Sequence, residues 1–231
     1  MLSKANDNSS CNFTFGFIYK KNNWLIDLDL YQKNITGLTS LSKGFQTVNS
    51  DYSEGKNDVK GIDFLLQKKW KNYSSWLSYS YSNAKFTFSN INKGNPFLGS
   101  LDVKHHFLWS HNFKLGAYNF SLGWNYRTGI PYTNGTKIDS DNQIIYDDEL
   151  NKSRLPSYHK LDFSGTYSFN FSTDKKWKGK VGLSLLNIYN QKNVLQRNFS
   201  VHTDENNHQM ISRNDTFSLG FTPNIVFRVL F

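Results

Sequence analysis

The chain has 231 residues, a formal net charge of +9, 16% aromatic residues and a mean hydropathy of −0.60. A soluble core rarely combines so many aromatic residues with so hydrophilic an average, whereas a membrane barrel averages an apolar band, aromatic girdles and a polar lumen into that mixture. There is no run of 18 or more apolar residues. This absence excludes a transmembrane helix but not strands that cross a membrane.

The positive charge does not indicate nucleic-acid binding, because the bases form no arginine-rich helix or basic stripe. They are scattered over expected turns and strand ends, as at Lys20-Lys21, Lys68-Lys69 and Lys175-Lys176. Cys11 is the only cysteine, so neither an intrachain disulfide nor a cysteine-based metal site is possible. Residues 1–10 are polar and form no secretory signal peptide, so an exported protein of this sequence is expected to be mature or a fragment.

Alternation of apolar and polar residues predicts about nine β-strands, and the first four are expected at 12–20, 24–33, 59–70 and 73–88. Short turns join the first strand to the second and the third to the fourth, whereas a long polar segment, 34–58, separates the second and third. Successive side chains of a strand point to opposite faces. Asp27 and Asp29 therefore oppose an apolar row that begins at Trp24, and Asp63 opposes Ile62 and Phe64.

The next four strands are expected at 104–113, 118–127, 161–171 and 178–189. A tight turn at Leu115-Gly116 joins the first two of them, and the longest loop, 129–157, follows. Arg127 and Asp162 fall on the polar sides of their strands. The alternation slips at Leu185-Leu186, which predicts a β-bulge, and 191–213 is expected to be a loop with some extended character.

The last strand is expected over 217–231, where every odd position is apolar and the even positions are mostly small or polar. Fifteen residues of alternation exceed the usual strand of about 5–6 residues in soluble proteins. Such a strand would be an aggregation hazard in water. We therefore expect a closing strand of a membrane barrel with its apolar side in lipid and Arg228 on the other side.

The connections alternate between short and long along the whole chain. Transmembrane barrels have this asymmetry, with tight periplasmic turns and longer extracellular loops. Counted back from the carboxy-terminus, the pattern places 34–58, 90–103, 129–157 and 191–213 outside. The fold class predicted from the sequence is thus an all-β, antiparallel transmembrane barrel.

Several segments resemble known proteins of this class. Residues 225–231 resemble the carboxy-terminal assembly signal of bacterial outer-membrane barrels, which implies that Phe227, Val229 and Phe231 are recognised by the barrel assembly machinery. The chain as a whole resembles the carboxy-terminal part of TonB-dependent receptors of the kind abundant in Bacteroidota. The segments that carry this resemblance are VKGID at 59–63, RTGIPY at 127–132, RLPSYHKLD at 154–162 and LNIYN at 186–190.

The resemblance implies that residues 1–231 form the last nine or so strands of a 22-stranded barrel with a plugged lumen. The plug domain, the TonB box and the signal peptide are then expected to be missing from this chain. The implied function is TonB-dependent uptake of a scarce ligand, such as a siderophore, cobalamin or an oligosaccharide, in the bacterial outer membrane. The implied partners are membrane lipid, the plug domain, TonB and the assembly machinery, and no cofactor is implied.

Six charged residues are expected to face the lumen: Asp27, Asp29, Asp63, Arg127, Asp162 and Arg228. Charges are tolerated there because the interior of such a barrel is polar. These residues are candidates for contact with a plug or a ligand. The alternative is mutual ion pairing along the wall.

Other chemistry is weakly indicated. His105 and His111 share a face but are about 20 Å apart along a strand, so girdle or surface histidines are favoured over a metal site. The acidic segment 139–149 resembles the start of a calcium loop, but it lacks the glycine and glutamate of an EF-hand. A nucleophile elbow, a phosphate loop and zinc-type histidine spacing are all absent from the sequence, so we do not expect an enzyme, although one outer-membrane phospholipase has a barrel fold.

Two rival functions remain at the level of sequence. The first is a small autonomous outer-membrane barrel with an adhesive or structural role. The second is a soluble β-sandwich that binds carbohydrate through its aromatic residues. The transported ligand is not specified, because loop residues determine it and none has a diagnostic pattern.

Overall fold

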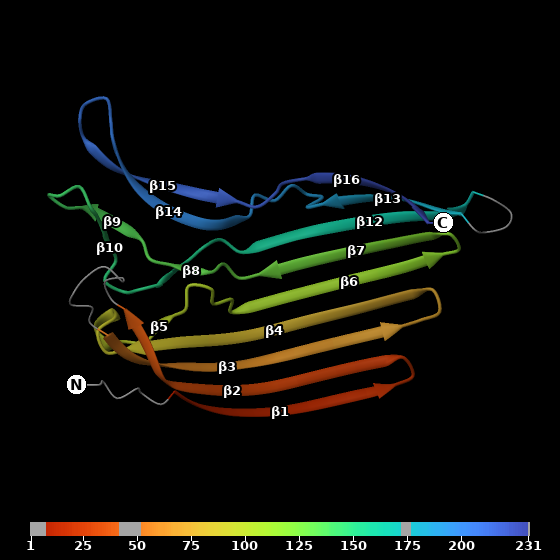
Figure 1. Cartoon of the computed structure of the whole chain (residues 1–231), viewed down its shortest axis with the longest axis horizontal. Helices are drawn as coiled ribbons and strands as arrows, with labels where there is room; N and C mark the ends of the chain where they lie inside the picture. Colours follow the sequence, from red (N-terminus) through yellow and green to blue (C-terminus); the bar gives the residue numbers. More distant parts are fainter. Residues whose placement is uncertain (1–7, 42–51, 172–176, 231) are drawn as a thin grey trace.

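The computed structural model describes residues 8–41, 52–171 and 177–230 and consists almost entirely of antiparallel β-strands. Nine of them form one continuous path in the order β1-β2-β3-β4-β6-β7-β12-β13-β16, so neighbours in sequence are neighbours in the sheet (Figure 1). The nine strands are β1 (Ser9–Lys21), β2 (Trp24–Leu41), β3 (Tyr52–Lys69), β4 (Tyr73–Phe88), β6 (His105–Leu115), β7 (Tyr118–Arg127), β12 (Tyr158–Asn170), β13 (Lys178–Leu186) and β16 (Thr222–Leu230). This number confirms the nine strands predicted from the alternation.

The register sorts the side chains onto two faces, because residues directly opposite each other in an antiparallel pair point to the same side. We name these the aromatic face and the polar face. One row of the aromatic face contains Phe17, Leu28, Phe64, Tyr79, Phe107 and Tyr126. The adjacent row of the polar face contains Gly16, Asp29, Asp63, Ser80, His106 and Arg127. In β16, Ile225 and Phe227 lie on the aromatic face, and Asn224 and Arg228 lie on the polar face, as predicted.

All the short connections lie at one end of the sheet, which we call the short-turn end (Figure 1). Asn22 and Asn23 connect β1 to β2 with φ angles of 50° and 63°. This left-handed pair is the geometry of a type I′ hairpin turn, which asparagine tolerates better than most residues. Gly116, at φ 57°, occupies the equivalent place between β6 and β7.

The long connections lie at the opposite end, the loop end, and they carry the short elements η1 (Asn92–Gly94), β5 (Phe97–Leu98), β8 (Pro131–Tyr132), β9 (Gly135–Ile138), β10 (Ile144–Tyr146), β11 (Ser153–Arg154), β14 (Val194–Thr203) and β15 (Gln209–Phe217). The element β5 extends the main sheet beside β4, and β8 pairs with β11, β9 with β10, and β14 with β15. The strict alternation of short and long connections is therefore confirmed.

The largest differences from the predicted strand limits lie at the loop end. Most of the expected loop 34–58 is strand, because β2 and β3 remain paired out to Leu41 and Tyr52, past a bulge at Gly37. The expected loop 191–213 belongs largely to the β14–β15 hairpin. Paired polar side chains give no alternation of hydrophobicity, so the sequence pattern does not reveal such strands.

The closing strand is shorter than predicted. Phe217 ends β15, and β16 begins only at Thr222, because Leu219 and Phe221 bind asparagine side chains instead of a neighbouring strand. The predicted bulge at Leu185-Leu186 is also wrong. The pairing of β13 is regular up to Leu186, where the strand ends before Asn187, whose φ is 51°.

The strands are staggered in a constant direction. The hydrogen-bonded row that starts at Trp24, the first residue of β2, reaches Pro223 in β16 after seven strand-to-strand steps. The end of β16 at the short-turn end is Leu230, and Pro223 lies seven positions before it. Over the seven steps the row therefore moves away from the short-turn end by about one residue per strand. With a rise of about 3.3 Å per residue and strands about 4.8 Å apart, this stagger corresponds to a tilt of about 35°. Barrel strands have this tilt.

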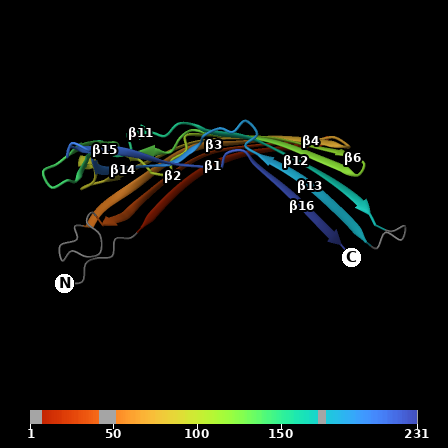
Figure 2. The same ribbon diagram turned by 90° about the horizontal axis from the view of Figure 1, so that it is seen from above.

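In the described part of the chain, the sheet is an open arch with no second layer packed against it (Figure 2). Among the described residues, β1 pairs only with β2 and β16 pairs only with β13. The buried hydrophobic side chains are Phe88, Leu155 and Val194. A β-sandwich needs a core between two sheets, so the soluble-sandwich alternative is wrong. The described residues contain no helix that is long and apolar enough to cross a membrane.

Candidate functional site

Three of the six predicted lumen-facing residues lie in one row across the polar face. Asp29 is directly opposite Asp63, and the row continues through Ser80 and His106 to Arg127. Two strands therefore lie between Asp63 and Arg127, so their backbone positions are about 14 Å apart at the usual strand spacing. The row brings an acidic section and a basic section onto the same face.

The acidic section is formed by the three carboxylates of β2 and β3. Asp27 lies two residues closer to the short-turn end than Asp29. It is directly opposite Ile18 on β1 and Leu65 on β3. Gly16 lies opposite Asp29 on β1, where a Cβ atom would be only 2.6 Å from the Asp29 Oδ1 atom. The missing side chain at Gly16 gives this carboxylate its place on the polar face.

The basic section ends in a stacked pair. The guanidinium of Arg127 lies 4.7 Å from the ring centre of Tyr158, its partner on β12. His106, on the other side of Arg127, approaches the Asn125 side chain to 3.3 Å. None of Asp27, Asp29, Asp63 and Arg127 belongs to an ion pair within the described part of the chain, whereas mutual pairing was the alternative considered for them.

The other two candidates lie elsewhere. Asp162 accepts hydrogen bonds from the backbone N–H of Asn187 at 2.8 Å and from the Lys160 ammonium at 2.5 Å. Its carboxylate therefore holds the start of the connection from β13 to β14. Arg228 lies opposite Lys180 near the short-turn end and is exposed. Neither residue joins the row of Asp29, Asp63 and Arg127.

At the loop end, a buried ion pair connects two long loops. The Asp102 side chain is 1% exposed and pairs with Arg154, which also donates to the carbonyl oxygens of Asp102 and Gly129. Gly129 packs so tightly on Leu155 that a Cβ atom would lie 1.8 Å from the Leu155 oxygen. These contacts give a structural reason for the RTGIPY and RLPSYHKLD segments.

A pocket of about 560 Å³ opens beside this ion pair, and we call it the loop pocket. Its walls come from three long connections, with Leu101 from the first, Tyr132 and Tyr146 from the second, and Arg197 and Phe199 from the third. The Tyr132 and Phe199 rings are stacked with centres 6.3 Å apart. The pocket is therefore lined by aromatic faces together with amide and hydroxyl groups.

Arg197 is fixed in the wall of the loop pocket. It donates two hydrogen bonds to the Asp215 carboxylate, at 2.7 and 2.8 Å, and a third to the Tyr132 hydroxyl at 2.7 Å. The hydrogen bond between the two groups lowers the pKa of the Asp215 carboxyl and raises the pKa of Arg197. The Arg197 charge is thus already paired, and the loop pocket has no free cation from this residue.

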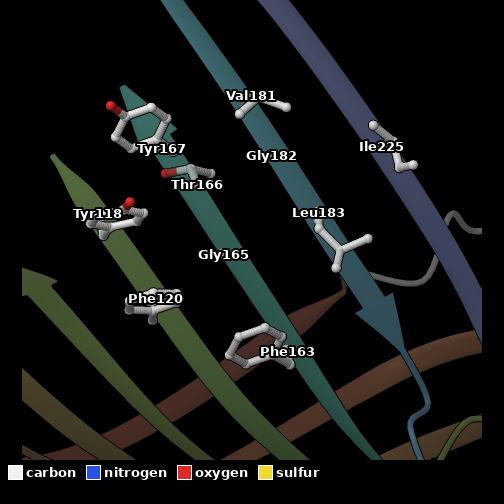
Figure 3. Close-up of a pocket in the computed structure, with 10 residues that line it drawn as sticks. All are labelled: Tyr118, Phe120, Phe163, Gly165, Thr166, Tyr167, Val181, Gly182, Leu183 and Ile225. Carbon is white, nitrogen blue, oxygen red and sulfur yellow. The ribbon is translucent and has the colours of Figure 1, made fainter. Parts of the chain in front are cut away.

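An apolar groove of about 410 Å³ lies on the aromatic face. Figure 3 shows that β7, β12, β13 and β16 each contribute to it, with Phe120, Gly165, Leu183 and Ile225 among the labelled residues. Gly165 interrupts a row of larger side chains between Phe120 and Leu183. The lining has almost no polar surface, so the groove offers no groups for acid–base or nucleophilic chemistry.

The remaining predicted residues have other surroundings. Phe227 and Val229 lie on the aromatic face of β16, and Phe231 is outside the described residues. His105 and His111 are on the aromatic face beside the hydroxyls of Tyr79 and Tyr73.

The acidic segment 139–149 contains the turn between β9 and β10, the strand β10 and the three residues that follow it. Asp139 accepts hydrogen bonds from the amides of its own turn, at Asp141 and Gln143. Asp148 and Glu149 pair with Lys93 and Lys152. Three carboxylates of this segment, those of Asp139, Asp148 and Glu149, therefore already have partners within the protein.

Sequence reasoning did not identify Arg197, Asp215 or the buried asparagines as site residues. Asn193 is 1% exposed and exchanges two hydrogen bonds with the backbone of His159. Asn187 is 2% exposed and binds the backbone of Gln191 and Leu219. A polar residue in a loop is ordinarily exposed, so the only signal was the concentration of asparagine in 187–193.

These features define a class of protein. Nine tilted antiparallel strands, with an aromatic face, a polar face and all long loops at one end, are part of the wall of a transmembrane β-barrel. The family model described as TonB dependent receptor-like, beta-barrel matches residues 9–190, and the chain belongs to this family. No curated protein matches the sequence.

Two solved structures share the fold. The unliganded ferric citrate transporter FecA has 15% sequence identity and a TM-score of 0.60, over 96% of this chain and 31% of FecA. The FrpB iron transporter from Neisseria meningitidis (F3-3 variant) has 12% identity and a TM-score of 0.63, over 98% of this chain and 32% of FrpB. The chain thus spans about a third of the length of each, and at these identities the likeness concerns the fold alone.

Proposed function

We propose that residues 1–231 form part of the barrel wall of an outer-membrane receptor that imports a scarce ligand with energy from TonB. The aromatic face contacts lipid, and the polar face lines the lumen. The observation that carries the proposal is the open, tilted sheet, whose aromatic and polar faces extend over all nine strands. The family to which the chain belongs and the transporter names of both structural neighbours support it.

The row of Asp29, Asp63 and Arg127 is proposed to contact the plug domain inside the barrel. Its charges are on the polar face and are not paired with one another, so they are available to a partner with complementary charges. Asp27 extends the acidic section. Asp162 holds a connection between strands, and Arg228 lies near the short-turn end, away from the row. We therefore assign both residues to the barrel wall and not to the plug contact.

The ligand is proposed to bind first at the loop end, where the loop pocket joins three connections. The ligand belongs to the siderophore, cobalamin or oligosaccharide class. We propose transport and not catalysis, because the described pockets bring together no nucleophile and base. A small autonomous barrel is not favoured, because β1 and β16 both have a free edge.

The terminal residues of β16 are proposed to act as the assembly signal in a receptor of Bacteroidota type. Phe227 and Val229 are apolar residues on the aromatic face of the last strand, and Phe231 follows them in sequence. Deleting Phe231 from the receptor should lower its amount in the outer membrane and increase its degradation in the periplasm. Equal amounts with and without Phe231 would contradict this role.

Growth of the source bacterium tests the transport function. A strain that lacks the receptor should grow poorly in one of three media, in which iron, cobalamin or a glycan carbon source is limiting. A plasmid copy of the receptor should restore growth in that medium only when TonB is present. Normal growth of the deletion strain in all three media, or restoration without TonB, would contradict the proposal.

A further inference from the structure

The short-turn end of the sheet is basic. Within three positions of the short turns, the described residues include no Asp or Glu, and the basic residues there are Lys20, Lys21, Lys68, Lys69, Lys71, Lys114, Lys178 and Lys180. In sequence, the connection 172–176 adds Asp174, Lys175 and Lys176. The excess of positive charge is therefore a property of this end of the molecule.

The ion pairs lie at the other end. Those formed by the described residues belong to the long connections or to the loop halves of their strands, for example Lys93–Asp148, Arg154–Asp102 and Arg197–Asp215. None of the lysines near the short turns takes part in these pairs. Within the described residues these lysines therefore have no acidic partner.

Two tryptophans hold one of these lysines at the aromatic face. The Lys68 Nζ atom is 4.6 Å from the ring centre of Trp24 and 5.6 Å from that of Trp70, and it donates a hydrogen bond to the Asn22 carbonyl at 2.9 Å. Lys21, which pairs with Trp24, is on the same face. Tryptophan and lysine together mark the boundary between hydrocarbon and water in membrane proteins.

The turns that carry these lysines are joined into one edge. The Lys69 amide donates to the Asn23 carbonyl at 3.1 Å, and the Lys114 amide donates to the Asn72 carbonyl at 2.8 Å. The first three short turns are therefore connected by backbone hydrogen bonds. Lys71 belongs to the second of these turns, three residues after Lys68 in the sequence.

We propose that Lys21, Lys68 and Lys71, framed by Trp24 and Trp70, bind the headgroups of anionic phospholipids. The proposal rests on the proposed function, because it requires the aromatic face to lie in a membrane. Three unpaired cations at the level of the tryptophans complement a headgroup that carries a net negative charge. A zwitterionic headgroup has no net charge, so it gains less from them.

Lipid selectivity of the reconstituted receptor tests this site. The receptor that contains this chain is placed in phosphatidylcholine vesicles, and the association of spin-labelled phosphatidylglycerol is compared with that of spin-labelled phosphatidylcholine. The wild-type protein should prefer phosphatidylglycerol, and the triple variant Lys21→Gln, Lys68→Gln, Lys71→Gln should lose most of this preference. Each lysine near a membrane surface contributes roughly fivefold.

The control variant removes the same number of charges at the loop end, through Lys93→Gln, Lys137→Gln and Lys152→Gln. It should keep the preference for phosphatidylglycerol. Equal binding of the two lipids by the wild-type protein, or an equal loss in both variants, would overturn the lipid site and leave the barrel intact. A receptor that fails to enter vesicles of any composition would instead contradict the proposed function.

Discussion

At the scale of single residues, the two faces of β16 differ most in their tolerance of charge. Ile225 is 81% exposed on the aromatic face, in a row with Leu183 and Gly165, whereas Asn224 lies on the polar face opposite Ser184. Phe227 is in the row of Tyr167, beside the aromatic residues of the short-turn end. These positions imply different depths in the proposed membrane.

Replacing Ile225 by Arg should therefore destabilise the inserted receptor by about 2–4 kcal/mol, the cost of a lipid-facing arginine near the midplane. Phe227→Arg should cost less, about 0–1 kcal/mol, because it is near an interface. The measurement is the free energy of unfolding from vesicles in guanidinium chloride. Asn224→Arg is the control and should be tolerated. A larger loss for Asn224→Arg than for Ile225→Arg would reverse our assignment of the faces.

Asp215 is the residue that fixes Arg197 in the loop pocket. The side chains are 12% and 9% exposed, so the pair is partly shielded from water. Asp215→Asn should weaken the docking of the β14–β15 hairpin by about 1–3 kcal/mol, because it removes the negative charge and one of the two carboxylate oxygens that accept from Arg197. Hydrogen exchange of the hairpin amides measures this loss. Glu149→Gln breaks only the exposed pair with Lys152 and should change little.

The same pair predicts a dependence on pH. The pKa of Asp215 is lowered in the folded protein by its hydrogen bond from Arg197, so its stabilising effect is complete above the unfolded value of about 3.9. It is lost as the pH falls through the lower folded pKa. Protection of the hairpin should therefore be constant from neutral pH to about pH 5 and decrease only in strong acid. A decrease between pH 7 and 6 would point to a different group.

At the scale of elements, sequence patterns predicted the strands that cross the aromatic band and failed at the loop end. The limits of β4 and β7 agree with the prediction. In both strands successive residues, such as Tyr79 and Ser80 or Trp124 and Asn125, face the aromatic side and the polar side in turn. The outer parts of β2 and β3 are mostly polar, and the bulge at Gly37 interrupts the spacing of the few apolar residues, so no period marks them. Their pairing comes from continued backbone hydrogen bonds along the hairpin.

The connection from β7 to β12 depends on a close backbone contact at Gly129. Gly129→Ala should displace the second loop and its Asp102–Arg154 pair, since the new Cβ atom would lie 1.8 Å from the Leu155 oxygen. Gly123→Ala is the control, because its Cβ atom would have no neighbour within 4 Å. Protease sensitivity of the loop in the inserted receptor measures the effect. Equal sensitivity of the two variants would show that the close contact is unimportant.

At the scale of the whole molecule, the two free edges of the sheet determine how the chain behaves. β1 and β16 each present unpaired backbone groups to one side, which favours association with other strands. The chain alone should therefore give no monomer whose electrophoretic mobility changes on heating, whereas the complete receptor should. A heat-modifiable monomer of the chain alone would instead support a small autonomous barrel.

The arrangement of the loops could not be predicted at this scale. The loop pocket joins Leu101, Tyr132 and Arg197, which are far apart in sequence and follow no periodic pattern. The polar row could be predicted in part, because Asp29, Asp63 and Arg127 each lie on a strand with clear alternation. Their common face followed from the alternation, but their position in a single row required the register.

The stagger of the strands places the members of this row at different distances from the loop end. Asp29 is five positions from the beginning of β2 at the short-turn end, whereas Arg127 is nine positions from the beginning of β7. For the tilt described above, the guanidinium is about 10 Å closer to the loop end than the carboxylate. In the proposed receptor, a molecule that travels inward along this wall would therefore meet a cation first and the carboxylates afterwards, as two separate encounters.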